Sequence, residues 1–247
     1  MRHTVRAELR FSCANTIARV ARTQAILFDI DGTLIESGGA SDRAWHRAFE
    51  ELHGVDVEIA KVTGKGVPDP AVGRQAFAAV IGREPSEEEM ARLMALRLKY
   101  LPEEVDSSPG YRTMPGVEEL LERLIDDGYL LGVTTGNVEG AAHIKLSRAS
   151  LNRFFSFGGY GSDSPDRTEL TRRALERGGV VFGKPLDPGR CFSIGDTPRD
   201  VEAGHGAGIR VTGVATGKYS VAELREAGAD AAIASLAEGL PLLEAGP

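Results

Sequence analysis

The sequence predicts an α/β protein, with a doubly wound parallel sheet and an inserted α-helical cap. Short, wholly apolar runs recur along the chain, and helical patterns separate most of them. Strands alternating with helices are typical of βαβ units, which build an open parallel sheet. The stretch from Ser41 to about Tyr100 shows helical patterns only. We therefore expect several helices to be inserted after the first strand as a separate cap.

The composition excludes several classes of protein. The 247 residues include 36 acidic and 29 basic side chains, for a formal net charge of −7, which argues against nucleic acid as the main partner. No apolar run approaches the ~18–20 residues that span a bilayer, so we expect no membrane insertion. Cys13 and Cys191 are too few for a disulfide scaffold, which favours a reducing, cytoplasmic location.

The order of the predicted elements divides the chain. Residues 1–23 carry five arginines and one acid, Glu8; an organelle transit peptide shares this bias, but we interpret the segment as a loosely ordered leader. Residues 24–36 and 112–247 are expected to form the α/β core, and residues 37–111 the helical cap. Strands are predicted at 25–28, 129–134, 191–194, 209–214 and 231–233, and helices at 116–125 and from near Asn137 and Asp166.

Two carboxylates follow the first predicted strand directly. Asp29 and Asp31 belong to the run Asp-Ile-Asp-Gly-Thr, which ends at Thr33, a candidate substrate-binding residue. Ligands of doubly wound sheets bind at the carboxyl ends of the strands, so both acids are placed at the expected site. One carboxylate can attack phosphorus while the other exchanges a proton with the leaving group or water. An Asp-Gly turn alone explains one acid but not the pair.

A second acidic motif ends the strand at 191–194. Asp196 follows that strand, and Asp200 comes four residues later, at the start of a helix. Asp196 or Thr197 is also a good N-cap before Pro198, but capping does not explain three convergent acids. Carboxylates gathered in one crevice repel each other unless a cation lies among them, and hard oxygen ligands favour Mg²⁺. We therefore expect a magnesium site.

The strand that ends near residue 134 leads into Thr135, Gly136 and Asn137. A hydroxyl beside the free N–H groups of a helix start forms a cradle for a phosphate-sized anion. The same residues also make an ordinary helix N-cap.

Together these three motifs, in this order, resemble the haloacid dehalogenase superfamily, in its phosphoglycolate-phosphatase-like branch, over about residues 24–235. The resemblance implies a flavodoxin-like (Rossmann-like) core with a helical cap. It implies that Asp29 is the nucleophile that forms an aspartyl-phosphate, that Asp31 is the general acid and base, and that Thr135 donates a hydrogen bond to the phosphoryl group. It further implies that Asp29, the Asp31 carbonyl and Asp196 hold Mg²⁺, with Asp200 behind them.

The family also places a lysine or arginine beside the phosphoryl group. Lys184 lies in a Lys-Pro-x-x-Pro-like run, but only five residues separate it from Arg190, too few for the helix that should follow it. Arg167 heads a helical pattern before the strand and is our preferred candidate, since a guanidinium grips phosphate oxygens and stays charged. Lys145 is a lesser candidate for this cation, and a solvated helix face is the expected place for it. Lys65, in the cap, is a candidate contact for the remote end of a substrate, although a solvated loop explains it too.

These expectations favour a Mg²⁺-dependent phosphatase acting on a small phosphorylated metabolite. A phosphosugar mutase shares the site but passes the phosphoryl group to a second hydroxyl. A phosphate-accepting module of the receiver type also gathers acids, a threonine and a lysine, but the paired acids and the helical insertion speak against it. The substrate itself and the oligomeric state are left open by the sequence.

Overall fold

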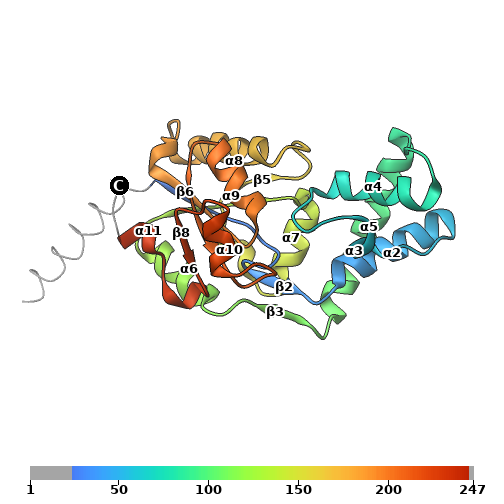
Figure 1. Ribbon diagram of the computed structural model, residues 1–247, viewed down its shortest axis with the longest axis horizontal. Coiled ribbons are helices and arrows are strands. Elements are labelled where there is room, and N and C mark those ends of the chain that lie inside the picture. The colour runs from blue at the N-terminus through green and yellow to red at the C-terminus, as the bar shows by residue number, and fades with distance from the viewer. Residues whose placement is uncertain (1–23, 245–247) are drawn as a thin grey trace, which may run out of the picture.

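A computed structural model describes residues 24–244, so the predicted leader at 1–23 lies outside the described residues. The chain folds into a sheet with helices on both faces, and a group of helices projects to one side (Figure 1). The strands are β1 (Ala25–Phe28), β2 (Ile35–Ser37), β3 (Tyr111–Thr113), β4 (Leu130–Thr135), β5 (Phe157–Tyr160), β6 (Cys191–Gly195), β7 (Arg210–Val214) and β8 (Ala231–Ile233). The α-helices are α2 (Ala40–His53), α3 (Ile59–Val62), α4 (Asp69–Ile81), α5 (Glu87–Ser107), α6 (Val117–Asp126), α7 (Glu139–Ser147), α8 (Arg167–Phe182), α9 (Pro198–Gly206), α10 (Val221–Glu226) and α11 (Pro241–Glu244).

The main sheet has six parallel strands in the order β5-β4-β1-β6-β7-β8. The first strand is therefore central, with β4 on one side and β6 on the other. Phe28, its last residue, pairs with Val133 of β4 and Ile194 of β6. Because the three strands run in the same direction, the segments that leave their carboxyl ends emerge side by side, and these segments hold the three predicted motifs.

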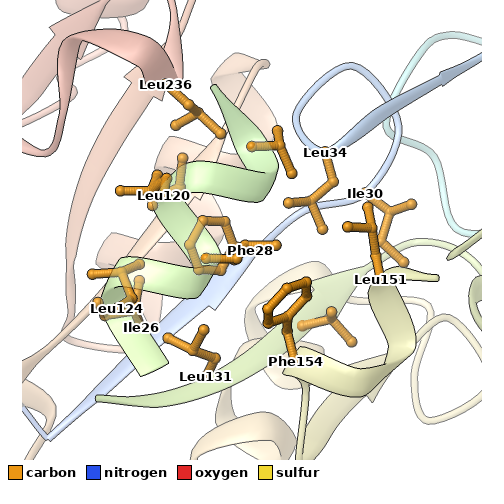
Figure 2. Packing of buried hydrophobic residues seen from close by; sticks show 14 of the residues in the cluster. Ile26, Phe28, Ile30, Leu34, Leu120, Leu124, Leu131, Leu151, Phe154 and Leu236 are labelled. Atoms are coloured by element: carbon orange, nitrogen blue, oxygen red, sulfur yellow. The ribbon is translucent and has the colours of Figure 1, made fainter. Parts of the chain in front are cut away.

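Successive residues of β1 face opposite layers of the core, as the pleat of a strand requires. Ile26 and Phe28 pack in one cluster with side chains of α6 and of the short helix at 151–154, which Figure 2 shows. Leu27 packs in a cluster on the other face with Ala174 of α8. Burial on both faces explains why this strand is wholly apolar.

The five predicted strands are confirmed to within one residue at each end. The three predicted helix starts lie within two residues of the first residues of α6, α7 and α8. The strand β5 was not predicted, because its sequence Phe-Gly-Gly-Tyr lacks the usual β-branched pattern. A Cβ on Gly159 would lie 1.8 Å from the carbonyl oxygen of Leu170. Packing against the backbone of α8 thus excludes a side chain there, a tertiary demand that outweighs strand propensity.

The helices α2 to α5 form the cap, between β2 and β3, which pair as an antiparallel ribbon. Trp45 and Phe49, four residues apart on α2, lie in its apolar core. Ser86 and Glu89 form a capping box at the start of α5. The domain division at 37–111 is still a proposal. Among residues 24–244, no helix has both the length and the apolar character needed to cross a bilayer.

Candidate active site

The turn after β1 places the first pair of acids. Asp29 continues the strand, and its N–H donates to the carbonyl of Ile194 at 2.9 Å. Gly32 then turns the chain with φ of +83°, a conformation that favours glycine. A Cβ at Gly32 would lie 2.4 Å from Oδ2 of Asp196. The glycine therefore both reverses the chain and leaves room for the carboxylate from the neighbouring strand.

Three buried carboxylates meet at this edge of the sheet. Asp29, Asp196 and Asp200 each offer an oxygen, and these oxygens all lie within 4.8 Å of one another. Burial, and then repulsion by Asp200, raises the pKa of Asp29 to about 7. The same causes, with Asp29 as a further repelling charge, raise the pKa of Asp196 to about 8. Among the described residues, Oδ1 of Asp196 is buried with no hydrogen-bond partner. The cluster offers only carboxylate oxygens, and its negative charge is not fully balanced by neighbouring cations. Such a cluster fits a small divalent cation.

Asp200 serves the local structure as well. Its Oδ2 accepts hydrogen bonds from the N–H of Thr197 at 3.0 Å and from the Thr197 hydroxyl at 2.7 Å. Thr197 is the N-cap of α9, and the two residues form a capping box. Asp196 is therefore not needed as a cap and faces the crevice. Capping thus fixes the Asp200 carboxylate through Oδ2, while its other oxygen, Oδ1, accepts a hydrogen bond from Arg167.

Arg167, the first residue of α8, reaches the carboxylates. Its Nη2 donates to Oδ1 of Asp200 and lies 3.6 Å from Oδ1 of Asp29. Its Nη1 donates to the carbonyl of Gly66 in the cap at 2.9 Å. Lys184, which was predicted to bind substrate, follows the far end of α8, with its Nζ 5.4 Å from the ring centre of Phe182. The prediction for Lys184 is corrected: the length of α8 separates it from the carboxylates.

A second cluster surrounds Asp31. Lys145 on α7 donates from Nζ to both oxygens of Asp31, at 2.9 and 2.7 Å, and to Oδ1 of Asn137 at 2.7 Å. The Asn137 amide donates to Asp31 and to the hydroxyl of Thr135, each at 2.8 Å. Burial works against the charged form of Asp31, but the charge and hydrogen bonds of Lys145 and the bond from Asn137 outweigh it and lower the pKa of Asp31.

The prediction that Lys145 lies on a solvated helix face is wrong, since the residue is only 2% exposed. The buried face of α7 consists of Ala141, Ala142, Lys145 and Leu146. The i, i+4 spacing from Ala141 to Lys145 was the available sequence signal, and a lysine on the inner face of a helix requires a partner. Asp31, more than 100 residues earlier in the chain, is that partner.

The two clusters line one cavity of about 320 Å³ between core and cap. Its core wall includes Asp29, Asp31, Thr135 and Asn137, and its cap wall includes the exposed Lys65. Ser41 and Thr63 also line the cavity, as do four residues that sequence reasoning had not singled out: Asp42, Ile59, Asp69 and Val72.

Thr33, predicted to bind substrate, is fully buried and does not line this cavity. This prediction is also corrected: the turn at Gly32 directs Thr33 away from the crevice, into the protein. Gly136, the remaining predicted residue, does line the cavity.

Comparison with known proteins agrees with this arrangement. The family model described as haloacid dehalogenase-like hydrolase matches residues 26–214. A phosphoglycolate phosphatase from Mesorhizobium japonicum is 30% identical over 210 residues, 81% of this chain and 86% of that protein.

Solved structures show the same fold. A predicted phosphoglycolate phosphatase from Haemophilus somnus aligns with a TM-score of 0.68 at 22% identity, over 87% of this chain and 96% of the other. CbbY from Rhodobacter sphaeroides, in complex with phosphate, aligns with a TM-score of 0.67 at 22% identity and the same coverage. With a family model covering most of the chain and a related sequence covering four fifths of it, this protein belongs to the haloacid dehalogenase-like hydrolases.

Proposed function

We propose that this chain is a Mg²⁺-dependent phosphatase that hydrolyses a small phosphate monoester through an aspartyl-phosphate. The observation that best supports this function is the convergence of Asp29, Asp196 and Asp200 on one point, with the guanidinium of Arg167 beside Asp29. A phosphate monoester is multiply charged and resists attack by an anion. Neutralisation of its oxygens is therefore the main task of such a site.

Asp29 is the proposed nucleophile. Its carboxylate oxygen bonds to phosphorus as the bond from phosphorus to the ester oxygen breaks. The protonated form of Asp31, a minor species because Lys145 lowers the pKa of this carboxyl, gives its proton to the departing alkoxide and becomes the carboxylate. A water then attacks the phosphorus of the aspartyl-phosphate, Asp31 takes its proton, and inorganic phosphate leaves with Asp29 restored. Arg167 and the hydroxyl of Thr135 donate hydrogen bonds to the phosphoryl oxygens.

The metal would be held by Asp29, Asp196 and the main-chain carbonyl of Asp31, with Asp200 braced behind them by Thr197. When bound, Mg²⁺ supplies Lewis-acid neutralisation of phosphate charge. The residues fit this role because their oxygens are hard donors that are buried together. Burial, and then repulsion between the acids, raises the pKa values of Asp29 and Asp196, so a cation would relieve the cost of their negative charge.

The cap wall defines the rest of the substrate. The cavity has room for a small metabolite only. Lys65 is a cap cation that lines it, and its charge also acts on Asp196. We propose that this lysine contacts an anionic end of the substrate. A phosphorylated hydroxy acid such as phosphoglycolate, for which the Mesorhizobium japonicum relative is named, has that chemistry. We therefore assign substrate specificity to the cap side chains that line the cavity.

The test is turnover of p-nitrophenyl phosphate with and without Mg²⁺. We expect multiple turnovers that EDTA abolishes and Mg²⁺ restores, and loss of turnover in Asp29→Asn with an unchanged circular dichroism spectrum. Full activity of Asp29→Asn would remove the mechanism. A single stoichiometric phosphorylation without turnover would instead identify a phosphate-accepting module.

A phosphosugar mutase is the second candidate, since half-exposed Asp31 faces the same cavity and could activate a sugar hydroxyl as well as water. Incubation with glucose 1-phosphate separates the two: release of inorganic phosphate supports the phosphatase, and conversion to the 6-phosphate supports the mutase.

A further inference from the structure

The helix α7 carries Lys145 and begins directly after Asn137, yet its own N-terminus is incompletely capped. Its N-cap residue is Val138, whose side chain accepts no hydrogen bond. The N–H groups at the start of a helix need acceptors. Here the N–H of Val138 donates at 2.8 Å to Oδ2 of Asp69, a residue of the cap. A carboxylate suits this position because the start of a helix carries partial positive charge.

Asp69 contacts the same turn in a second way. Its own N–H donates to the carbonyl of Gly136 at 2.8 Å. Asp69 thus accepts one hydrogen bond from the turn Thr135–Val138 and donates another to it. This turn contains Thr135 and Asn137, which form the hydrogen-bond network with Asp31. Three residues before Asp69, the carbonyl of Gly66 accepts from Arg167. One cap segment, residues 66–69, therefore contacts two parts of the core site.

Asp69 is itself fixed by a buried arginine. Arg97 of α5 is fully buried, and its Nη1 donates to the same Oδ2 of Asp69 at 2.8 Å. Its guanidinium lies 4.7 Å from the ring centre of Trp45, and its Nη2 donates to Ser41 at 3.2 Å. A buried cation is costly unless paired. The pair therefore orients the Asp69 carboxylate toward the core.

We propose that Asp69 is a positioning residue that the cap supplies to the core: it completes the N-terminus of α7 and holds the turn Thr135–Val138 in its working geometry when the cap segment 66–69 lies against it. This inference rests on the proposed phosphatase function and deepens it, because it makes the phosphate-binding turn dependent on a cap residue.

The test compares two substitutions of Asp69 and two of Val138, assayed with p-nitrophenyl phosphate and Mg²⁺ well below the melting temperature. Asp69→Asn keeps an oxygen for the Val138 N–H, and Asp69→Ala removes it. Val138→Pro removes the N–H at a residue whose φ of −63° suits proline, and Val138→Ala keeps it. We expect Asp69→Asn and Val138→Ala to retain kcat/KM within about threefold, and Asp69→Ala and Val138→Pro to lose about tenfold or more.

A merely structural role for Asp69 would not produce this pattern. Asp69→Asn, like Asp69→Ala, removes the charge that pairs with Arg97. If Asp69 acted only through this pair, the Asn and Ala variants would be equally impaired, and their activities would follow their thermal stabilities. That result, or a Val138→Pro variant as active as Val138→Ala, overturns the proposal. If the Asp69 variants do not fold, the Val138 pair decides alone.

Hydrogen–deuterium exchange provides a readout that does not need activity. A peptide covering residues 135–138 should exchange faster in Asp69→Ala than in Asp69→Asn, and equal rates contradict the proposal. If the wild-type chain shows no Mg²⁺-dependent turnover, the proposed function fails, and the exchange rates still decide whether Asp69 orders the turn.

Discussion

Asp29 and Asp31 are separated by one residue, but the structure gives them opposite surroundings. Asp29 lies with Asp196 and Asp200, and one guanidinium, Arg167, faces the three acids. Asp31 has an ammonium of its own, from Lys145. The pKa of Asp29 is raised and that of Asp31 is lowered. The difference teaches that the first cluster is arranged to gain a cation, whereas the second is already compensated within the protein.

The largest effect should follow from weakening the first cluster. We expect Asp196→Asn to reduce kcat/KM for p-nitrophenyl phosphate on the order of 100-fold or more at 1 mM Mg²⁺, because it removes a charged oxygen from the metal site. Higher Mg²⁺ should recover part of the loss. A Mg²⁺ titration of initial rates measures this, and an unchanged midpoint would contradict the assignment of Asp196 as a ligand.

The second cluster is tested with Lys145→Met, which keeps the shape but not the charge. The variant removes the two hydrogen bonds that orient the Asp31 carboxyl. Because a misplaced acid no longer reaches the leaving oxygen, we expect a loss in kcat/KM of about 10-fold or more for alkyl phosphates, even though the pKa of Asp31 rises. The loss should be smaller for p-nitrophenyl phosphate, whose leaving group needs no proton. Lys184→Met is the matched control and should resemble the wild type. Equal losses for both substrates would mean that Lys145 acts on stability alone.

The contrast also predicts how stability depends on pH. The folded pKa values of Asp29 and Asp196, about 7 and 8, exceed the ordinary value of 3.8. Such groups stabilise the fold at low pH and lose that contribution as pH rises from 3.8 through the folded pKa values, because over this range the unfolded chain has released protons that the folded chain still binds. In EDTA we therefore expect these two groups to lower the melting temperature between about pH 5 and 8, on the order of 5 °C, with no further fall above the folded pKa values.

Mg²⁺ should raise the melting temperature at pH 9 and flatten this dependence, since it binds the ionised folded state. Differential scanning fluorimetry of the wild type and Asp196→Asn measures both effects, and the variant should show the shallower slope. A melting temperature that stays constant or rises over this range in EDTA would contradict the raised pKa values.

The smallest expected effect concerns the cap. Lys65→Ala should raise KM for phosphoglycolate about fivefold, with little change in KM for p-nitrophenyl phosphate, because the lysine is exposed and its interaction is screened. Lys184→Ala, outside the cavity, should change neither value more than about twofold. Steady-state kinetics on both substrates separates the two variants. If KM for both substrates rises equally in Lys65→Ala, the lysine acts on the phosphate rather than on the remote end.

Much of the site followed from local sequence. The apolar run 25–28 predicted a strand buried on both faces, because such a strand needs continuous apolar residues. The acids after it predicted a site at the carboxyl end of that strand, because this end opens into the crevice. The strand before Asp196 followed in the same way. The edge strand β5 did not, because close packing against α8 selected its glycines, and a contact of that kind leaves no periodic signal.

The sequence by itself determined which acids leave the carboxyl ends of the strands, that helices are inserted between the first strand and the rest, and that a cationic helix start at Arg167 precedes β6. Local rules suffice there, since periodicity, caps and turns act within a few residues. Only the tertiary structure decided that Lys145 faces inward to Asp31, that Lys184 and Thr33 do not reach the cavity, and that Asp69 caps a core helix from the cap. These outcomes depend on pairs of residues far apart in sequence, whose partners become neighbours only when the sheet and cap pack together.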